Sequence, residues 1–294
     1  MSKTKAFDFA VIGGDARQIY MIGALIEQKY RIICAGLEHT ALPSCVQKAH
    51  SLQDAAAGSD VLLCPVPLSK NGTDITVTGC TLPDATADAL IDALTGSHTL
   101  ISAAIPPQVA EHCKNIGCAC YDLMQRDDVA IHNAVATAEG TLAELILRGT
   151  GNLHQSRVLI IGFGRCAQVL AAKLLGLAMH VTVCARNHSA RALAQALGYE
   201  AIDFSQLDGE LSSFAYVVNT VPALILTHTR VALLDDEAVV IDIATSPGGV
   251  DFKAAAQLHK NCVLCPGLPG RYAPKTSGEI IANAVLAILS EGSD

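Results

Sequence analysis

RVLIIGFGRCAQVL, residues 157–170, is the stretch of this 294-residue chain that decides its fold. The aliphatic run Arg157–Ile161 predicts a buried strand, and the apolar spacing over Arg165–Leu175 predicts an amphipathic helix. A second strand is expected at Val181–Cys184. This strand–helix–strand spacing is that of a dinucleotide-binding βαβ unit of a parallel sheet.

The turn inside this unit has the spacing G-x-G-x-x-A. Gly162 permits the tight turn, Gly164 lets the backbone approach a pyrophosphate, and Ala167 permits close packing of helix on strand. The helix N-terminus then offers unpaired N–H groups and a positive dipole end to the anion. A glycine turn that binds nothing is the alternative. The residues predicted to contact the cofactor are Gly162, Phe163, Gly164, Arg165 and Cys166.

The end of the second strand indicates which dinucleotide binds. NAD sites usually carry Asp or Glu there, as a hydrogen-bond acceptor for the ribose hydroxyls. This chain has Ala185, Arg186 and Asn187 instead. Arg186 offers a planar, bidentate partner for a 2′-phosphate, unless it is simply a solvent-exposed arginine. The sequence therefore predicts NADP in preference to NAD.

Two later strands also end in residues suited to ligand contacts, because ligands of open α/β sheets bind at the carboxyl ends of the strands. One strand ends in Val218–Pro222, and another runs into Ile241–Asp251. Asn219 and Asp242 could equally be turn residues. The further cofactor candidates from these segments are Asn219, Thr220, Val221, Pro222 and Asp242, and Ser246 is a candidate for substrate binding.

The rest of the chain repeats the alternation of short aliphatic runs with segments of helical length. This pattern predicts parallel strands covered on both faces by helices, that is, two doubly wound Rossmann-like sheets facing across a cleft. The predicted strands are Phe7–Ile12, Arg31–Ala35, Asp60–Cys64, Thr99–Ala103 and Cys118–Asp122, then Arg157–Ile161, His180–Cys184, Ala215–Asn219, Val239–Asp242 and Cys262–Cys265.

Two helices fit neither half of this pattern. Ala136–Leu147 is expected to carry the chain from the first sheet to the second, and Ser277–Leu289 to return over the first. We therefore predict an N-terminal substrate or partner domain at 1–135, completed by a helix at 276–294. Residues 136–150 form the linking helix, and 151–275 the NAD(P)-binding domain.

Composition excludes several classes of protein. A net charge of −8 without a Lys/Arg cluster argues against a nucleic-acid partner, and no apolar run is long enough to span a membrane. Eleven cysteines, mostly in apolar segments, indicate buried thiols in a reducing compartment. No pattern of histidines or cysteines indicates a metal site. The expected location is the cytoplasm.

A second glycine turn, Gly13–Gln18, follows the first strand but lacks G-x-G spacing. Arg17 at a helix N-terminus could hold a substrate carboxylate. Equally, Asp15 could cap the helix and leave Arg17 in solvent. Near the other end of the chain, Lys275 and Thr276 lead into the last helix and are candidates for anion contacts.

The scaffold is similar to that of D-2-hydroxyacid dehydrogenases, but the sequence lacks the two catalytic side chains that their reaction needs. Those enzymes need an Arg for the substrate carboxylate, in a stretch like Ile241–Asp251, where this chain has Ala244–Gly248. They also need a His near Pro269, where this chain has Gly270.

Taken together, five motifs resemble the A subunits of dipicolinate synthase, a family from spore-forming bacteria, over nearly the whole chain. The segment Leu68–Gly72 departs from the pattern expected of that family. The motifs that carry the resemblance are Gly13–Gln18, Pro65–Pro67, Thr137–Gly140, Ser246–Phe252 and Leu268–Thr276.

The resemblance implies oxidation of a dihydropyridine-type dicarboxylate to pyridine-2,6-dicarboxylate in the mother cell of a sporulating bacterium. It also implies a flavoprotein-like B subunit as partner, and we expect the chain itself to form homo-oligomers. Arg17, Lys275 and Thr276 are available for the carboxylates. Asp15, Glu139 or water could serve as the base, with Lys275 as a further catalytic candidate.

Two other classes of function remain open on the same residues. One is a different NADP-dependent enzyme on this scaffold, such as an imine or keto-acid reductase. The other is a non-catalytic NADP-binding subunit.

Overall fold

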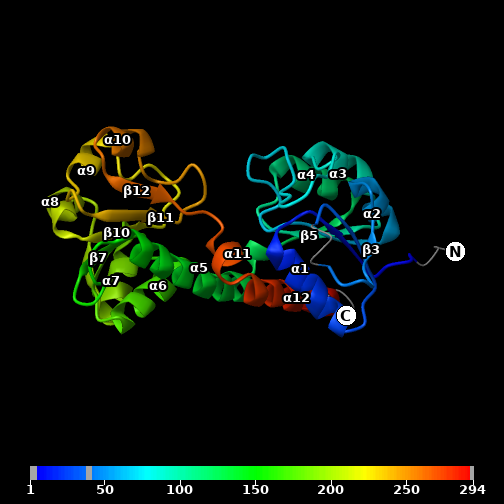
Figure 1. Cartoon of the computed structure of the whole chain (residues 1–294), viewed down its shortest axis with the longest axis horizontal. Coiled ribbons are helices and arrows are strands. Elements are labelled where there is room, and N and C mark those ends of the chain that lie inside the picture. The colour runs from blue at the N-terminus through cyan, green and yellow to red at the C-terminus, as the bar shows by residue number, and fades with distance from the viewer. Residues whose placement is uncertain (1–4, 38–41, 292–294) are drawn as a thin grey trace. The chain divides into compact units, whose positions relative to one another are not determined.

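The computed structural model describes residues 5–37 and 42–291, and the chain divides into two compact units. The N-terminal unit consists of 1–130 together with 273–294, and the second unit consists of 131–272. Each unit is built around its own six-stranded parallel sheet (Figure 1).

The N-terminal sheet has the order β3-β2-β1-β4-β5-β6, with the first strand near the centre. Its edge strand β3 is only two residues long. All neighbouring strands pair in parallel. The strands are β1 (Phe9–Ile12), β2 (Ile32–Ala35), β3 (Gln47–Lys48), β4 (Val61–Leu63), β5 (Thr99–Ser102) and β6 (Ala119–Asp122).

Helices cover both faces of this sheet because successive strand residues point to opposite faces. Phe9 and Val11 pack in one apolar cluster with α1 and α12, whereas Ala10 and Ile12 pack in another with α2, α3 and α4. The helices are α1 (Ala16–Glu27), α2 (Leu52–Gly58), α3 (Ala87–Ala93), α4 (Pro107–Ile116) and α12 (Pro274–Glu291), with a 3₁₀ turn at Leu123–Gln125.

The second sheet has the order β12-β11-β10-β7-β8-β9. Numbered from its own first strand, this is the same order as in the N-terminal sheet, read from the opposite edge. Its pairs are also parallel. The strands are β7 (Arg157–Ile161), β8 (His180–Cys184), β9 (Glu200–Ile202), β10 (Tyr216–Asn219), β11 (Val239–Asp242) and β12 (Asn261–Leu264).

Helices again cover both faces. Val158 and Ile160 pack toward α5, α6 and α7, and Leu159 and Ile161 pack toward the opposite layer of α8, α9 and α10. The helices are α5 (Asp127–Arg148), α6 (Arg165–Gly176), α7 (His188–Ala196), α8 (Leu207–Glu210), α9 (His228–Ala232), α10 (Phe252–Gln257) and α11 (Leu268–Tyr272), with a 3₁₀ turn at Leu211–Ser213.

The predicted fold class, two parallel Rossmann-like α/β sheets, is confirmed, and the local differences have physical causes. The linking helix begins at Asp127, not Ala136, with two acidic residues in its first turn, where they favour a helix start. The short α11 was not predicted, because Pro269 and Gly270 are poor helix formers. Packing against α5 stabilises it nevertheless.

Candidate functional site

The glycine turn between β7 and α6 is shaped first by Gly162. This residue has φ of +96°, a conformation that side-chain-bearing residues rarely adopt. A Cβ there would contact the Thr220 hydroxyl and would lie 2.9 Å from Cγ2 of Val221. Gly162 is therefore required by the turn itself, as the sequence predicted.

Gly164 differs, because nothing in the protein requires a glycine at its position. Its φ is −82°, which any residue can adopt, it is exposed, and a Cβ there would meet no heavy atom within 4 Å. Gly164 is also the N-cap of α6, and no side chain caps that helix end. The first N–H groups of α6 are thus left without a side-chain cap, which suits a pyrophosphate.

The other residues of this turn differ in how far their side chains are exposed. Phe163 is buried and packs edge-on against Tyr199, with ring centroids 6.0 Å apart. Cys166 is half-buried and hydrogen-bonded to Thr137, and burial raises the pKa of its thiol. Phe163 can therefore reach a cofactor only through its backbone, whereas the exposed Arg165 can reach one with its side chain.

The segment after β8 combines an exposed guanidinium with a second one that holds the turn. Arg186 is exposed, and Asn187 caps α7 by accepting a hydrogen bond from the Ser189 N–H at 2.8 Å. Arg191, one turn into α7, donates from Nη1 to the carbonyl oxygens of Ala185 (2.7 Å) and Arg186 (2.9 Å). Its Nε and Nη2 form no hydrogen bond with any described residue.

Asn219 and Asp242 form a buried pair at the carboxyl ends of β10 and β11. Asn219 donates to Asp242 Oδ1 at 2.9 Å and to the Val221 carbonyl at 3.0 Å. Asp242 also accepts from the N–H groups of Ala244 (3.0 Å) and Gly249 (2.6 Å). Both side chains are fully buried, so they serve the turns, which is the second role that the sequence allowed.

The remaining candidates of this unit lie around that pair. Thr220 and Val221 are half-buried, and the Thr220 hydroxyl donates to the Ile161 carbonyl at 2.8 Å. Pro222 and Ser246 are exposed. The buried pair thus holds two loops whose outer residues are accessible to a ligand.

In the N-terminal unit, the turn after β1 is closed by its own side chains. Asp15 caps α1 and pairs with Arg17, with Nη2–Oδ2 at 2.7 Å. Arg17 is only 5% exposed, so the alternative in which it is solvated is wrong. Burial alone would raise the pKa of Asp15, but hydrogen bonds and charge from Arg17, aided by Lys70, hold it below its ordinary value.

The boundary predicted at 275 assigns Lys275 to the second domain and Thr276 to the helix that completes the N-terminal domain. Both residues belong to the N-terminal unit, because α12 packs along α1 (Figure 1). One turn further on, Gly278 packs against the Arg17 carbonyl. Both side chains are exposed. Two of the predicted anion contacts therefore share a unit with Arg17.

Glu139 is an exposed side chain paired with Lys173 at 2.9 Å. Glu144, one turn later on α5, is buried and was not predicted. It accepts from Tyr272 at 2.7 Å and lies 2.9 Å from both Arg148 and Arg271. Burial would raise its pKa, but these donors outweigh burial and lower it. Through Tyr272 and Arg271, Glu144 thereby links α11 to α5.

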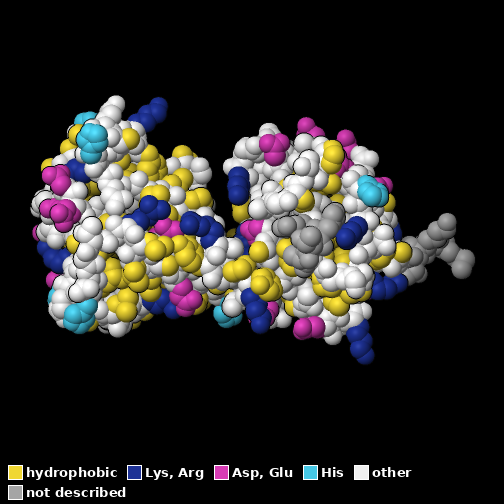
Figure 2. All heavy atoms as spheres, in the orientation of Figure 1, with side chains coloured by type: hydrophobic (Ala, Val, Ile, Leu, Met, Phe, Trp, Pro, Cys, Tyr) yellow, Lys and Arg dark blue, Asp and Glu magenta, His cyan; other side chains and the backbone are white. Residues whose placement is uncertain are grey.

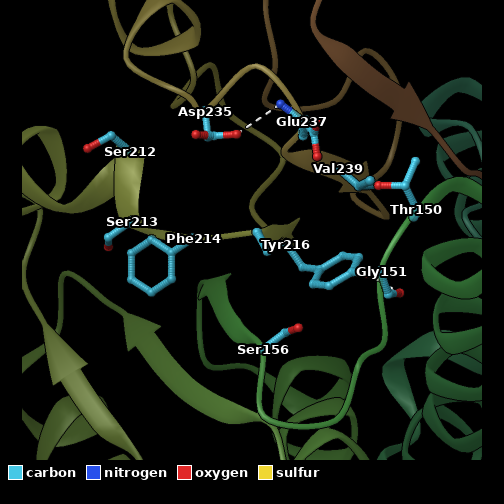
Figure 3. A pocket seen from close by; sticks show the side chains of 12 residues that line it. Thr150, Gly151, Ser156, Ser212, Ser213, Phe214, Tyr216, Asp235, Glu237 and Val239 are labelled. Carbon is cyan, nitrogen blue, oxygen red and sulfur yellow. Dashed lines mark hydrogen bonds between the residues drawn. The ribbon is translucent and has the colours of Figure 1, made fainter.

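A cavity of about 310 Å³ lies at the opposite, amino-terminal edge of the second sheet (Figure 3). It is lined by small polar residues, by the rings of Phe214 and Tyr216, and by Asp235 and Glu237. The Glu237 N–H donates to Asp235 at 2.9 Å. Its two carboxylates would repel the pyrophosphate of a dinucleotide, so it is poorly suited to hold one.

The surface charge, the possible metal ligands and the helices bear on other kinds of ligand site. On the face shown in Figure 2, Lys and Arg side chains are dispersed and do not gather into a basic patch. Among the described residues, no group of three His, Cys, Asp or Glu could hold a metal ion. None of the described helices is long and apolar enough to cross a membrane.

Burial raises the pKa of the Cys64 thiol to about 12, as expected of an inert buried cysteine.

Besides Glu144, three residues near these sites were missed by the sequence reasoning. Arg191 could have been found as a second arginine in the first turn of the helix after Arg186. Lys70 lies in Leu68–Gly72, the segment that departs from the pattern expected of the family and to which no role was assigned. Gln18 lies in the motif Gly13–Gln18, but the sequence did not indicate its reciprocal capping bond to Asp15.

The two sheets, with an open glycine turn at the start of α6, form the two-domain architecture of dehydrogenase-type oxidoreductases that use a nicotinamide dinucleotide. Family models agree. Residues 8–124 match the N-terminal domain of the dipicolinate synthase A subunit, and residues 142–262 match shikimate / quinate 5-dehydrogenase. The chain belongs to the family of dipicolinate synthase A subunits, because a curated member matches it over nearly its full length.

That member is the dipicolinate synthase A subunit of Bacillus subtilis (strain 168), which is 31% identical over 96% of this chain and 95% of its own. Among solved structures, the dipicolinate synthase A subunit from Bacillus halodurans has a TM-score of 0.86 at 28% identity, covering 97% of this chain and 98% of its own. A transhydrogenase from Sinorhizobium meliloti has a TM-score of 0.67 at 13% identity over 96% and 93%, and shows the shared fold.

Proposed function

We propose that this chain is the NADP-dependent oxidoreductase subunit of a dipicolinate synthase, which oxidises a dihydrodipicolinate-type precursor to pyridine-2,6-dicarboxylate. Within the chain, the observation that carries the proposal is Gly164. Its ordinary φ and empty surroundings leave no internal reason for a glycine. A pyrophosphate over the N-terminus of α6 supplies that reason. Membership of the family supplies the substrate class.

The residues that would hold the cofactor fit it. The N-terminus of α6 takes the pyrophosphate, and the loops held by Asn219 and Asp242 border the same edge of the sheet. A bound nicotinamide would supply the hydride acceptor. Because the substrate would give up a hydride and a proton as its ring becomes aromatic, the protein mainly has to orient it and let the proton leave.

NADP in preference to NAD is supported by the end of β8. No carboxylate stands at Ala185, Arg186 or Asn187 to repel a 2′-phosphate. Arg186 is exposed, and in nearby Arg191 the Nε and Nη2 atoms form no hydrogen bond with any described residue. Asp203, at the end of the neighbouring strand, is turned to its own loop and accepts from the Ser205 N–H at 2.8 Å.

The substrate carboxylates are assigned to the N-terminal unit. Arg17 is buried at the carboxyl end of β1, and Lys275 and Thr276 begin the helix that packs beside it. Cationic side chains and open N–H groups together suit a dicarboxylate. Ser246 is a further candidate, from the second unit. Glu139 is less suited to act as a base, because Lys173 already pairs with it.

The relative from Bacillus subtilis is named as one subunit of its synthase, which supports a complex. We propose a flavoprotein-like B subunit as the partner, a homo-oligomer of this chain, and the mother-cell cytoplasm of a sporulating bacterium as the location. The dispersed surface charge gives no support to a nucleic-acid partner.

The test is turnover by the purified protein, alone and with the B subunit, supplied with freshly prepared dihydrodipicolinate and NADP. We expect pyridine-2,6-dicarboxylate and NADPH to appear in equal amounts. NADPH consumption with imines or keto acids, and no dipicolinate, would instead favour a reductase. Binding of NADP without turnover in either mixture would favour a non-catalytic role.

A further inference from the structure

The Arg17 guanidinium is held on two sides by its own chain. Nε donates to Asp15 Oδ1 at 2.9 Å, and Nη2 donates to Asp15 Oδ2 at 2.7 Å. Nη2 also donates to the Val66 carbonyl oxygen. A guanidinium fixed at two nitrogens by a carboxylate and a carbonyl has one orientation, although it ends a long side chain.

Nη1 is the remaining nitrogen. It has no hydrogen-bond partner among the described residues, and it is not one of the polar atoms buried there without a partner. The small exposed fraction of Arg17, 6% of its side chain, is thus compatible with an accessible Nη1. Two N–H groups of a fixed cation are left for a ligand.

Two residues that bond to this turn also carry unpaired polar groups. Gln18 Nε2 and Thr76 Oγ1 are buried and have no partner among the described residues. Both residues touch the turn, because Gln18 Oε1 accepts from the Asp15 N–H at 2.9 Å and the Thr76 carbonyl accepts from the Gly14 N–H at 2.7 Å.

A third such group comes from α12. The Ser277 hydroxyl is buried and unpaired within the described part of the chain, and the next residue, Gly278, packs against the Arg17 carbonyl. Buried polar groups are paired in more than about 90% of cases. An amide N–H and two hydroxyls are donors, and a carboxylate offers only acceptors.

We propose that Asp15 is a positioning residue: it fixes Arg17 so that Nη1 binds one carboxylate of the substrate. This inference rests on the proposed dicarboxylate oxidation and assigns Asp15 a role other than base. Both Asp15 oxygens already accept from Arg17, and Arg17 and Lys70 lower its pKa. A carboxylate of lowered pKa is a weak base near neutral pH, so the proton leaves by another route.

The test uses Asp15→Asn and Asp15→Ala, with pyridine-2,6-dicarboxylate binding measured by calorimetry in the presence of NADP. Asparagine keeps an oxygen that can cap α1 and accept from Arg17, whereas alanine removes both. We expect Asp15→Ala to weaken dicarboxylate binding about tenfold, and Asp15→Asn by less than about threefold. Turnover at saturating substrate stays within about twofold for Asp15→Asn, because no proton passes through this residue.

Asp8 provides a matched control at the other end of β1. It forms a similar fork with Arg31, with Nη2–Oδ1 at 2.9 Å and the Arg31 N–H on Oδ2 at 2.7 Å. Asp8→Asn and Asp8→Ala should leave dicarboxylate binding unchanged.

Four other results would contradict the positioning role of Asp15. Loss of turnover in Asp15→Asn with unchanged binding would make Asp15 the base. Tighter binding in either Asp15 variant would make it a competitor of the substrate for Arg17, and unchanged binding in Asp15→Ala would leave it only a helix cap. If the unaltered protein binds NADP but no dicarboxylate, the proposed substrate itself is wrong, and the positioning role is withdrawn with it.

Discussion

The two units have the same strand order, yet the turns after their first strands are built for different purposes. In the N-terminal unit, the turn from β1 to α1 is filled: Asp15 caps the helix, and the Thr76 carbonyl accepts from Gly14. In the second unit, the turn from β7 to α6 is open, and no side chain caps the helix at Gly164.

The difference separates a glycine that the fold requires from a glycine that the fold does not require. Gly13 has φ of +65°, and a Cβ there would lie 2.8 Å from the Thr76 carbonyl. Gly164 has an ordinary φ and an empty neighbourhood. The first position is constrained by the chain itself, and the second is not. The same topology therefore carries an open turn in one unit and a filled turn in the other.

The largest effect is expected from Gly164→Val. Valine fits the free protein, because its backbone conformation is allowed and no atom stands nearby, but its branches take the space of the pyrophosphate. We expect NADP affinity to fall more than about a hundredfold with an unchanged melting temperature of the free protein. Calorimetry and thermal unfolding measure both.

Gly176→Val is a suitable control, since a Cβ at Gly176 also meets nothing within 4 Å and this residue ends α6 far from its N-terminus. NADP binding at normal strength by Gly164→Val would place the cofactor elsewhere.

Gly13→Ala should show the opposite behaviour. Alanine at a positive φ, with its Cβ against the Thr76 carbonyl, should destabilise the N-terminal unit by about 2 kcal/mol. Because a protein of two units need not unfold in one step, hydrogen exchange of the β1 and β2 amides is the appropriate measurement. NADP affinity should stay the same. Equal exchange in both proteins would show that this turn tolerates a side chain.

Much of this comparison was predictable from sequence. The run Arg157–Ile161 followed by G-x-G-x-x-A identified the open turn, because strand, turn and helix signals coincide there. The spacing of Gly13–Gln18 argued against a second dinucleotide site, in keeping with the filled turn. The parallel sheets followed from the alternation of strands and helices, but the order of the strands within each sheet was not predicted.

What could not be predicted depends on contacts between distant segments. The burial of Arg17 requires the Val66 carbonyl, and the placement of Lys275 with Arg17 requires α12 to pack on α1. Helix α11 exists because Gly140 leaves room for Leu268 and Tyr272, and because Glu144 binds Tyr272. No local propensity encodes these contacts.

The smallest effect concerns which dinucleotide the open turn accepts. We expect NADP to bind about tenfold more tightly than NAD, a difference of about 1.4 kcal/mol. Arg186→Ala should remove most of that difference and leave NAD affinity nearly unchanged, because a guanidinium gains most from a doubly charged phosphate. Calorimetric titration of both dinucleotides gives the comparison directly.

Arg157→Ala is the control for this last experiment, since it removes the same charge from the opposite, amino-terminal end of β7.

Arg191→Ala separates two roles for the second arginine. A loss for NADP alone would mean that its spare nitrogens contact the 2′-phosphate. An equal loss for both dinucleotides would mean that it only holds the turn through Ala185 and Arg186. Equal affinities for NADP and NAD in the unaltered protein would contradict the NADP preference, while leaving the open turn after β7 as the dinucleotide site.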